Sequence, residues 1–78
     1  LLRSYLVHRA MRERQIVEAL GTAPRTVAEL VARLYQNLAE ELHGAAAESV
    51  LAHLVKLEEE GGATRETEGE VTRWRRSG

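Results

Sequence analysis

Apolar residues recur at helical spacing in three separate stretches of the chain. The first stretch, residues 2–20, contains neither Gly nor Pro. Its apolar residues fall along one stripe of a helix of 3.6-residue period: Leu2, Leu6, Ile16 and Leu20, with Tyr5 and Val17 at the edges. Gly21 then supplies a common C-terminal stop. The pattern predicts an amphipathic helix over residues 2–20.

A loop and a second helix follow. Pro24 disfavours helical geometry in the residue before it, so we expect a loop between Gly21 and Thr26. Thr26 and Glu29 have the spacing of a capping box, which starts a helix. Apolar residues then continue at the i, i+3, i+4 and i+7 positions, namely Val27, Leu30, Val31 and Leu34. We predict a helix over residues 27–36.

The third helix is preceded by a turn over residues 37–41, with a short 3₁₀ piece. Asn37 favours a break, and Glu40 and Glu41 suit the N-terminus of a following helix. This helix runs to near Glu60, where two glycines end it. We expect its inward stripe to comprise Ala46, Ala47, Val50, Leu51, Leu54 and Leu57, with His43 on the same side and His53 beside it.

The C-terminal stretch favours extended structure. Residues 63–74 are rich in Thr and include Val71 and Trp74, on either side of a predicted turn at Glu68-Gly69. Alternation places Val71 and Arg73 on one face and Trp74 on the other, with Glu70 and Thr72. We expect Trp74 to pack on the helices and residues 75–78 to fray.

This order of elements predicts a mainly α fold, the winged helix-turn-helix, with three helices and a C-terminal β-hairpin wing. One domain over residues 1–78 is all that this length allows. A plain three-helix bundle with a disordered tail is the alternative architecture. It would leave Val71 and Trp74 without a packing role.

Composition limits how the protein can be stabilised and where in the cell we expect it. The absence of cysteine excludes disulfides and thiolate metal sites, so stability must come from packing. The apolar runs are far shorter than the roughly 20 residues that span a bilayer, and no signal segment is recognisable at the start. We therefore expect a cytoplasmic protein. The start at Leu1-Leu2 suggests a domain excised from a longer chain.

Charge is unevenly distributed along the chain, whose formal net charge is -1. The middle is acidic and the two ends are mildly basic. The third helix would read DNA in this fold, and its outward residues are Ala45, Glu48, Ser49, Ala52, Val55, Lys56 and Glu59. Bases are read mainly by Arg, Lys, Asn and Gln, and phosphates repel Glu. This surface is therefore better suited to docking on protein than to the major groove.

Candidate chemistry is sparse. His8, His43 and His53 have no i, i+4 pairing and no Asp or Cys in ligand register, so we interpret them as structural and predict no metal site. Arg9 and Glu13 lie in the middle of the first apolar stripe, which predicts an i, i+4 ion pair. No nucleophile–base pair, carboxylate cleft or phosphate loop can be assembled, so we predict no catalytic residues.

One cluster is typical of nucleic-acid binding. It combines guanidinium groups with a stacking ring, in Arg65, Arg73, Arg75 and Arg76 with Trp74. The other interpretation is a solvated wing and tail whose charge is offset by Glu66, Glu68 and Glu70. RNA binding whose affinity falls as the salt concentration rises would favour a nucleic-acid-binding cluster over a solvated wing.

Three stretches resemble a known family in their order and spacing. They are His8-Arg9 with Arg12-Glu13 and Ile16; Thr26-Val27 with Glu29-Leu30-Val31 and Tyr35; and His53-Leu54 with Lys56-Leu57-Glu58 and Glu60-Gly61. Together they resemble the winged-helix domain at the C-terminus of metallo-β-lactamase-fold hydrolases of the β-lactamase-like protein 2 type. The sequence departs from that pattern at Gly62-Ala63, where basic or larger apolar residues would open the first wing strand.

The resemblance implies that catalysis belongs to an N-terminal domain outside this chain, with a His-x-His-x-Asp-His motif and a zinc pair. It also implies that the small domain lies against the catalytic one, and that the substrate is RNA-like. We therefore expect no cofactor in this chain, zinc in the catalytic domain, that domain as the partner, weak RNA contact and no membrane.

Two functions stay open at this point. The leading one is a non-catalytic accessory domain of a metal-dependent hydrolase, which shapes access to the active site and offers arginines to a polyanionic substrate. The alternative is a stand-alone winged-helix regulator that binds nucleic acid. A basic surface on the third helix would favour the alternative, and this sequence lacks one.

Overall fold

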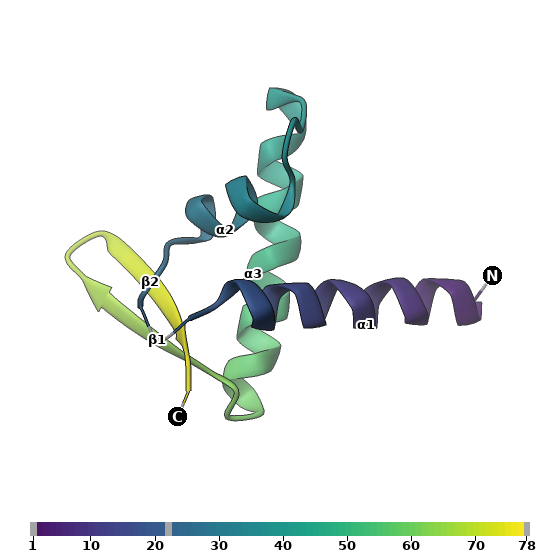
Figure 1. Ribbon diagram of the computed structural model, residues 1–78. Coiled ribbons are helices and arrows are strands. Elements are labelled where there is room, and N and C mark those ends of the chain that lie inside the picture. Colours follow the sequence, from purple (N-terminus) through teal and green to yellow (C-terminus); the bar gives the residue numbers. More distant parts are fainter. Residues whose placement is uncertain (1, 22, 78) are drawn as a thin grey trace.

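Three helices and a two-stranded hairpin form the structure, a computed structural model that describes residues 2–21 and 23–77, with side chains from residue 8 onward. The elements are α1 (Leu2–Ala19), α2 (Val27–Leu34), the 3₁₀ helix η1 (Glu40–Leu42), α3 (His43–Glu59), β1 (Ala63–Glu68) and β2 (Val71–Arg76). Helices α1 and α3 cross, and the hairpin lies beside the C-terminal half of α3 (Figure 1). The predicted mainly α winged-helix fold is confirmed, and the bundle with a disordered tail is wrong.

Helix α1 contributes to the core through its C-terminal half. Ile16 and Leu20 are fully buried there. The N-terminal half extends past α3 in Figure 1. The side chains of Leu2, Tyr5 and Leu6, which we placed on the same apolar stripe, lie outside the described residues. The core contact of the described part of α1 is therefore concentrated in its last turns.

Helix α2 starts as predicted and ends early. The Glu29 amide donates to Thr26 Oγ1 at 3.1 Å and Glu29 Oε1 accepts from the Thr26 amide at 2.8 Å, so the capping box is confirmed. Tyr35 leaves helical geometry at φ -124 and ψ 71, and Asn37 adopts a left-handed φ of 63. The predicted end at Gln36 is therefore wrong by two residues, because the chain already turns towards α3 at Tyr35.

Helix α3 buries a face that differs slightly from the predicted one. Ala46, Val50, Leu54 and Leu57 are buried, as predicted. Leu51 was wrongly placed inside, since it is 42% exposed, and His53 is buried in its place with 8% exposed. Because α1 packs on the side of α3 that carries His53, the buried face is rotated towards that residue. His43 is exposed rather than in the core, and its Nε2 lies 3.1 Å from the Leu38 carbonyl oxygen.

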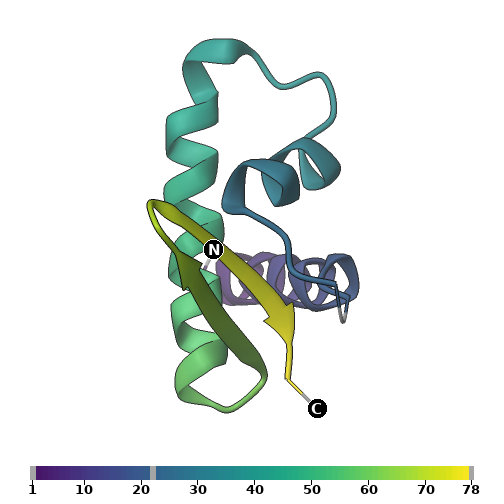
Figure 2. The same cartoon turned by 90° about the vertical axis from the view of Figure 1, so that its left-hand side faces the viewer.

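The hairpin is held on both edges of its second strand. Its register runs from Ala63 opposite Arg76 to Glu68 opposite Val71, and Gly69 takes the positive φ of 62 in the turn. On the other edge, Arg25 and Trp74 exchange two backbone hydrogen bonds of 2.9 and 2.7 Å. Figure 2 looks onto the hairpin and shows it lying across the lower half of α3. The loop after α1 thus acts as a rudimentary third strand.

The expected fraying of the C-terminal residues is wrong for residues 75–77. The Arg76 amide donates to the Gly21 carbonyl at 2.9 Å, and the Ser77 amide donates to the Gly62 carbonyl at 3.1 Å. Gly78 lies outside the described residues. Trp74, 1% exposed, packs on the helices as predicted, and Ala63 is buried at the start of β1. Burial of the ring fixes β2, and the flanking backbone hydrogen bonds extend that order to Ser77.

Candidate functional site

The four arginines predicted as a nucleic-acid cluster lie on two opposite faces of the hairpin. Arg65 is paired with the buried Trp74, so its side chain and that of Arg76 share the face that meets the helices. Arg73 and Arg75 lie on the other face, where Arg73 is opposite Glu66. Strand alternation therefore separates residues that are close in the sequence, and they do not form one basic patch.

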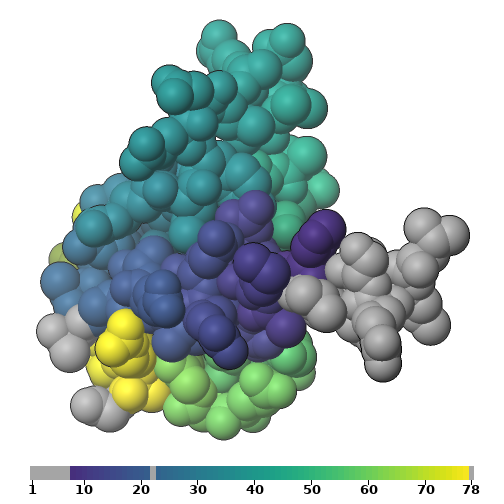
Figure 3. All heavy atoms as spheres, turned by 45° about the vertical axis from the view of Figure 1, so that its right-hand side comes forward, coloured from purple at the N-terminus to yellow at the C-terminus, as the bar shows by residue number. Residues whose placement is uncertain are grey.

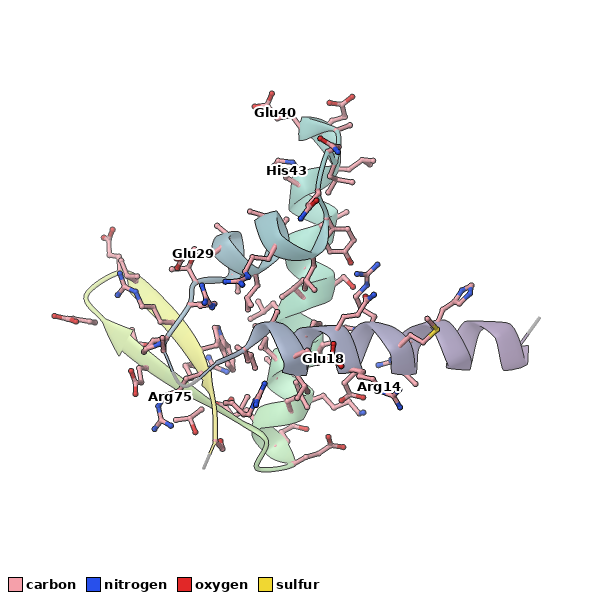
Figure 4. All side chains as sticks on the ribbon, viewed as in Figure 1. Arg14, Glu18, Glu29, Glu40, His43 and Arg75 are labelled. Atoms are coloured by element: carbon pink, nitrogen blue, oxygen red, sulfur yellow. The ribbon has the colours of Figure 1, made fainter. Side chains whose placement is uncertain are left out.

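Three of these arginines have partners within the domain. The guanidinium of Arg65 lies over the Trp74 ring, 4.6 Å from its centroid, and donates to Glu58 Oε1 at 2.9 Å. Arg75, labelled in Figure 4, donates to Glu66 Oε1 at 2.8 Å. Arg76 reaches back to α1 and donates to the Val17 carbonyl at 2.7 Å. Arg65 and Arg76 therefore tie the hairpin to the helices, whereas Arg73 is exposed.

The outward surface of α3 has the character that the sequence predicts. Ala45, Glu48, Ser49, Ala52 and Glu59 are exposed, and we call these residues the outer face of α3. Val55 is half-buried against the core instead. Lys56 is engaged, because its Nζ lies 3.0 Å from Glu13 and 3.7 Å from Glu60. The hydrogen bond to Glu13 raises the pKa of Lys56. The outer face therefore offers carboxylates and small side chains.

The predicted ion pair between Arg9 and Glu13 is wrong. Both carboxylate oxygens of Glu13 accept from Lys56 Nζ, at 3.0 and 3.1 Å, across the crossing of α1 and α3. Arg9 lies one turn earlier on α1 and is exposed. Glu13 therefore joins two helices rather than two turns of one helix. Local spacing gave no signal for a partner that lies 43 residues away.

A cleft between α1 and α3 was not anticipated from the sequence. It has a volume of about 560 Å³ and is lined by His8, Arg9, Met11, Arg12 and Gln15 of α1 and by Ser49, Ala52 and His53 of α3. Figure 3 faces this side of the molecule and shows α1 lying across α3. The sequence does show two arginines one turn apart on α1, Arg9 and Arg12. That they line the same cleft as His53 depends on how α1 crosses α3, which the sequence does not show.

One side chain in this cleft is held in place by its neighbours, and the pKa of another is shifted by its surroundings. Arg12 Nη1 donates to Gln15 Oε1 at 2.8 Å, and its guanidinium lies 4.3 Å from the centroid of the Tyr35 ring. Burial lowers the pKa of His53; Glu13 opposes this shift, and the nearby cations Arg9, Lys56 and Arg12 add to it. The cleft is thus a partly organised, positively charged site.

A second hollow separates α2 from the N-terminal half of α3. It has a volume of about 580 Å³ and is lined mainly by small or apolar residues: Ala28, Val31, Ala32, Tyr35, Gln36, Asn37, Leu38, His43, Gly44 and Ala47. His43 lies at the upper end of α3 in Figure 4. We call this hollow the apolar groove. Its lining favours contact with apolar groups.

Within residues 2–21 and 23–77, no three His, Cys, Asp or Glu side chains come together in a way that could hold a metal ion. His8 lines the cleft, His43 contacts a backbone carbonyl and His53 is buried. Over the same residues, none of the helices combines the length and the apolar character needed to cross a bilayer.

Comparison with protein families identifies a family to which this chain is similar. A family model described as the beta-lactamase associated winged helix domain matches residues 26–74. The match begins at the capping residue Thr26 and ends at the buried Trp74, so it includes α2, α3 and most of the hairpin. Helix α1, and with it most of the lining of the cleft, lies outside the matched segment.

Proposed function

This chain belongs to the beta-lactamase associated winged helix domain family, and we propose that it is a non-catalytic accessory domain that packs on a metallo-β-lactamase-fold catalytic domain of the same parent protein. In this proposal the zinc ions and the hydrolytic chemistry belong to the catalytic domain. The winged helix shapes access to that active site and helps to hold a polyanionic, RNA-like substrate.

The observation that carries the proposal is the outer face of α3. In a helix-turn-helix protein this face enters the major groove, where phosphate neutralisation supplies much of the affinity. Here Glu48 and Glu59 would meet phosphates, and Lys56 is already paired with Glu13. The alanines of the same face allow close approach of another polypeptide. This composition supports protein docking over the alternative, a stand-alone nucleic-acid-binding regulator.

The apolar groove extends the docking surface. Leu51 lies one turn along α3 from Ala47 of the groove lining and is 42% exposed. Leu42, at the start of α3, is 51% exposed. Exposed apolar side chains beside a hollow are typical of protein interaction sites. The surface formed by the groove, Leu51 and the outer face of α3 is therefore where we expect the catalytic domain to dock.

The wing supports the substrate part of the proposal. Arg73 is exposed, and Arg75 donates to Glu66, which is itself exposed, and at 3.5 Å to the Arg76 carbonyl. Ion pairs between exposed side chains are weak, about 0–1 kcal/mol, so a phosphate could replace this carboxylate. We propose that Arg73 and Arg75 contact RNA weakly from the outward face of the hairpin, whereas Arg65 and Arg76 act through their structural contacts.

Docking is tested with two exposed apolar residues of nearly equal exposure. Leu51 is 42% exposed on α3 and Val71 is 41% exposed on the wing, so Leu51→Arg and Val71→Arg form a matched pair. The variants are made in the parent protein, and amide hydrogen exchange of α3 is compared with that of the separate 78-residue chain. We expect α3 to be protected in the parent protein, and Leu51→Arg alone to remove that protection. Equal exchange of α3 in parent and fragment would contradict the proposal.

A further inference from the structure

We propose that the cleft between α1 and α3 binds a phosphate group. This inference goes beyond the proposed function, because it rests on the cleft itself and holds whether or not the chain docks on a catalytic domain. The site is separate from the wing, which carries Arg65, Arg73, Arg75 and Arg76, and it shares Ser49 and Ala52 with the outer face of α3. Its ligand is a phosphate-bearing molecule, either a small phosphate compound or a nucleic-acid strand.

The charge of the lining selects an anion. His8, Arg9 and Arg12 bring two guanidinium groups and an imidazole to one side of the cleft, and none of its described lining residues is acidic. The carboxylate nearest to this arrangement is Glu13, which acts on His53 electrostatically and is already bound by Lys56 at 3.0 Å. The positive charges of the cleft are therefore not neutralised from within, and a walled cleft concentrates their field.

Arg12 is arranged in advance for a ligand. Its guanidinium is stacked on Tyr35 and uses one N–H group on Gln15. A guanidinium carries five N–H donors in a fixed planar fork, so several donors remain after that contact. Because the side chain is already held, binding a ligand costs less conformational entropy than it would with a free arginine.

His53 adds a polar ring to the α3 wall of the cleft. Its side chain is 8% exposed and lines the cleft, and in the described part of the chain no protein group forms a hydrogen bond with its ring. The nitrogens of this ring are not among the buried polar atoms that lack a partner, so they are accessible to a ligand in the cleft. Ser49, one turn earlier on α3, lines the same cleft and adds a hydroxyl donor.

The number and arrangement of donors favour phosphate over a carboxylate. Potential donors lie on both walls of the cleft, namely Arg9 and Arg12 on α1 and Ser49 and His53 on α3. A phosphate group offers three or more acceptor oxygens in different directions, whereas a carboxylate offers two in one plane. The cleft volume of about 560 Å³ also falls in the range of small-molecule sites.

The test measures binding by NMR on the 78-residue chain labelled with ¹⁵N. The probes are inorganic phosphate, pyrophosphate and a short single-stranded RNA. We expect saturable shifts confined to the residues that line the cleft, including the ring of His53. The double variant Arg9→Gln, Arg12→Gln should weaken binding about tenfold or more, since it removes both charge-assisted donors.

The matched control is Arg14→Gln. Arg14, labelled in Figure 4, is an exposed arginine of α1 that does not line the cleft, so its loss changes net charge equally. Binding by this variant should equal that of the wild type. The single variant Arg9→Gln, at an exposed position, should still weaken binding severalfold and keeps the test valid if loss of the Arg12 contact with Tyr35 impairs folding.

The probes also distinguish the sources of the phosphate. RNA that binds in the cleft much more tightly than inorganic phosphate or pyrophosphate supports the site and identifies a nucleic-acid strand. RNA that binds no more tightly than the small probes supports the site with a small phosphate compound. Absence of saturable cleft shifts with all three probes, or equal weakening by Arg14→Gln, overturns the proposal. None of these outcomes bears on docking, which the Leu51 and Val71 variants test.

Discussion

The arginines of the wing and those of α1 are in opposite situations. In the wing, Arg65, Arg75 and Arg76 are bound by Glu58, Glu66 and the Val17 carbonyl, within the domain. On α1, Arg9 and Arg12 line a cleft whose described lining contains no acidic residue. Two members of the cluster that is conspicuous in the sequence, Arg65 and Arg76, therefore tie the hairpin to the helices, whereas Arg9 and Arg12 are the pair that we propose to bind a ligand. Closeness in sequence is a poor guide to which charges are free.

The largest effect should come from removing the ring on which the wing is anchored. Trp74 is 1% exposed, so Trp74→Ala should lower the free energy of unfolding by about 3–5 kcal/mol, through lost burial and the cavity left behind. Chemical denaturation measures this, with Val71→Ala as the control, because Val71 is 41% exposed on the same strand. Similar losses of unfolding free energy for the two variants would show that burial of Trp74 does not anchor the wing.

A smaller effect should separate the two groups of arginines directly. Arg65→Ala loses the contact with Trp74 and the pair with Glu58, and should lower the free energy of unfolding by about 1 kcal/mol. Arg9→Ala removes an exposed side chain and should change it by less than about 0.5 kcal/mol. Urea denaturation of both variants measures the contrast. Equal losses of stability would show that Arg65 of the wing stabilises the fold no more than Arg9 of the cleft does.

The smallest effect that we expect is a pH dependence of folding stability caused by His53, which lines the cleft. Burial lowers the pKa of His53 below its ordinary value near 6.5, with Arg9, Lys56 and Arg12 acting in the same direction and Glu13 against it. The unfolded chain therefore binds this proton at a higher pH than the folded chain does. It follows that His53 lowers the stability progressively as the pH falls below about 6.5.

Denaturation curves of the wild type and of His53→Gln, measured at pH values on both sides of about 6.5, check this prediction. The variant should lose less stability on acidification than the wild type does. NMR titration of the ring gives its pKa directly. A value above the ordinary one in the absence of phosphate would contradict the burial that we assign to His53.

Features set by neighbouring residues were predictable from the sequence. The capping box of Thr26 and Glu29, the turn at Gly69 and the placement of Trp74 each follow from local spacing or strand alternation. The helix order and the hairpin then follow, because each of these signals fixes an element boundary or a buried face.

Features set by the crossing of α1 and α3 were not predictable. The exposure of Leu51, the burial of His53 and the pairing of Glu13 with Lys56 all depend on where the two helices meet. Periodicity identifies the apolar side of a helix to within about one residue position on either side, and the crossing decides between neighbours. The cleft has the same origin, since its two walls come from helices far apart in the sequence.

The two backbone hydrogen bonds between Arg25 and Trp74 limit how the hairpin can pair with another molecule. With β1 on one edge of β2, the other edge is covered at Trp74 by its bridge to Arg25. In the part of the chain that the structure describes, β1 has no strand on its outer edge, but it carries Arg65, Glu66 and Glu68. Charged side chains on an edge strand discourage edge-to-edge growth. The hairpin should thus resist amyloid-like stacking even in concentrated solution.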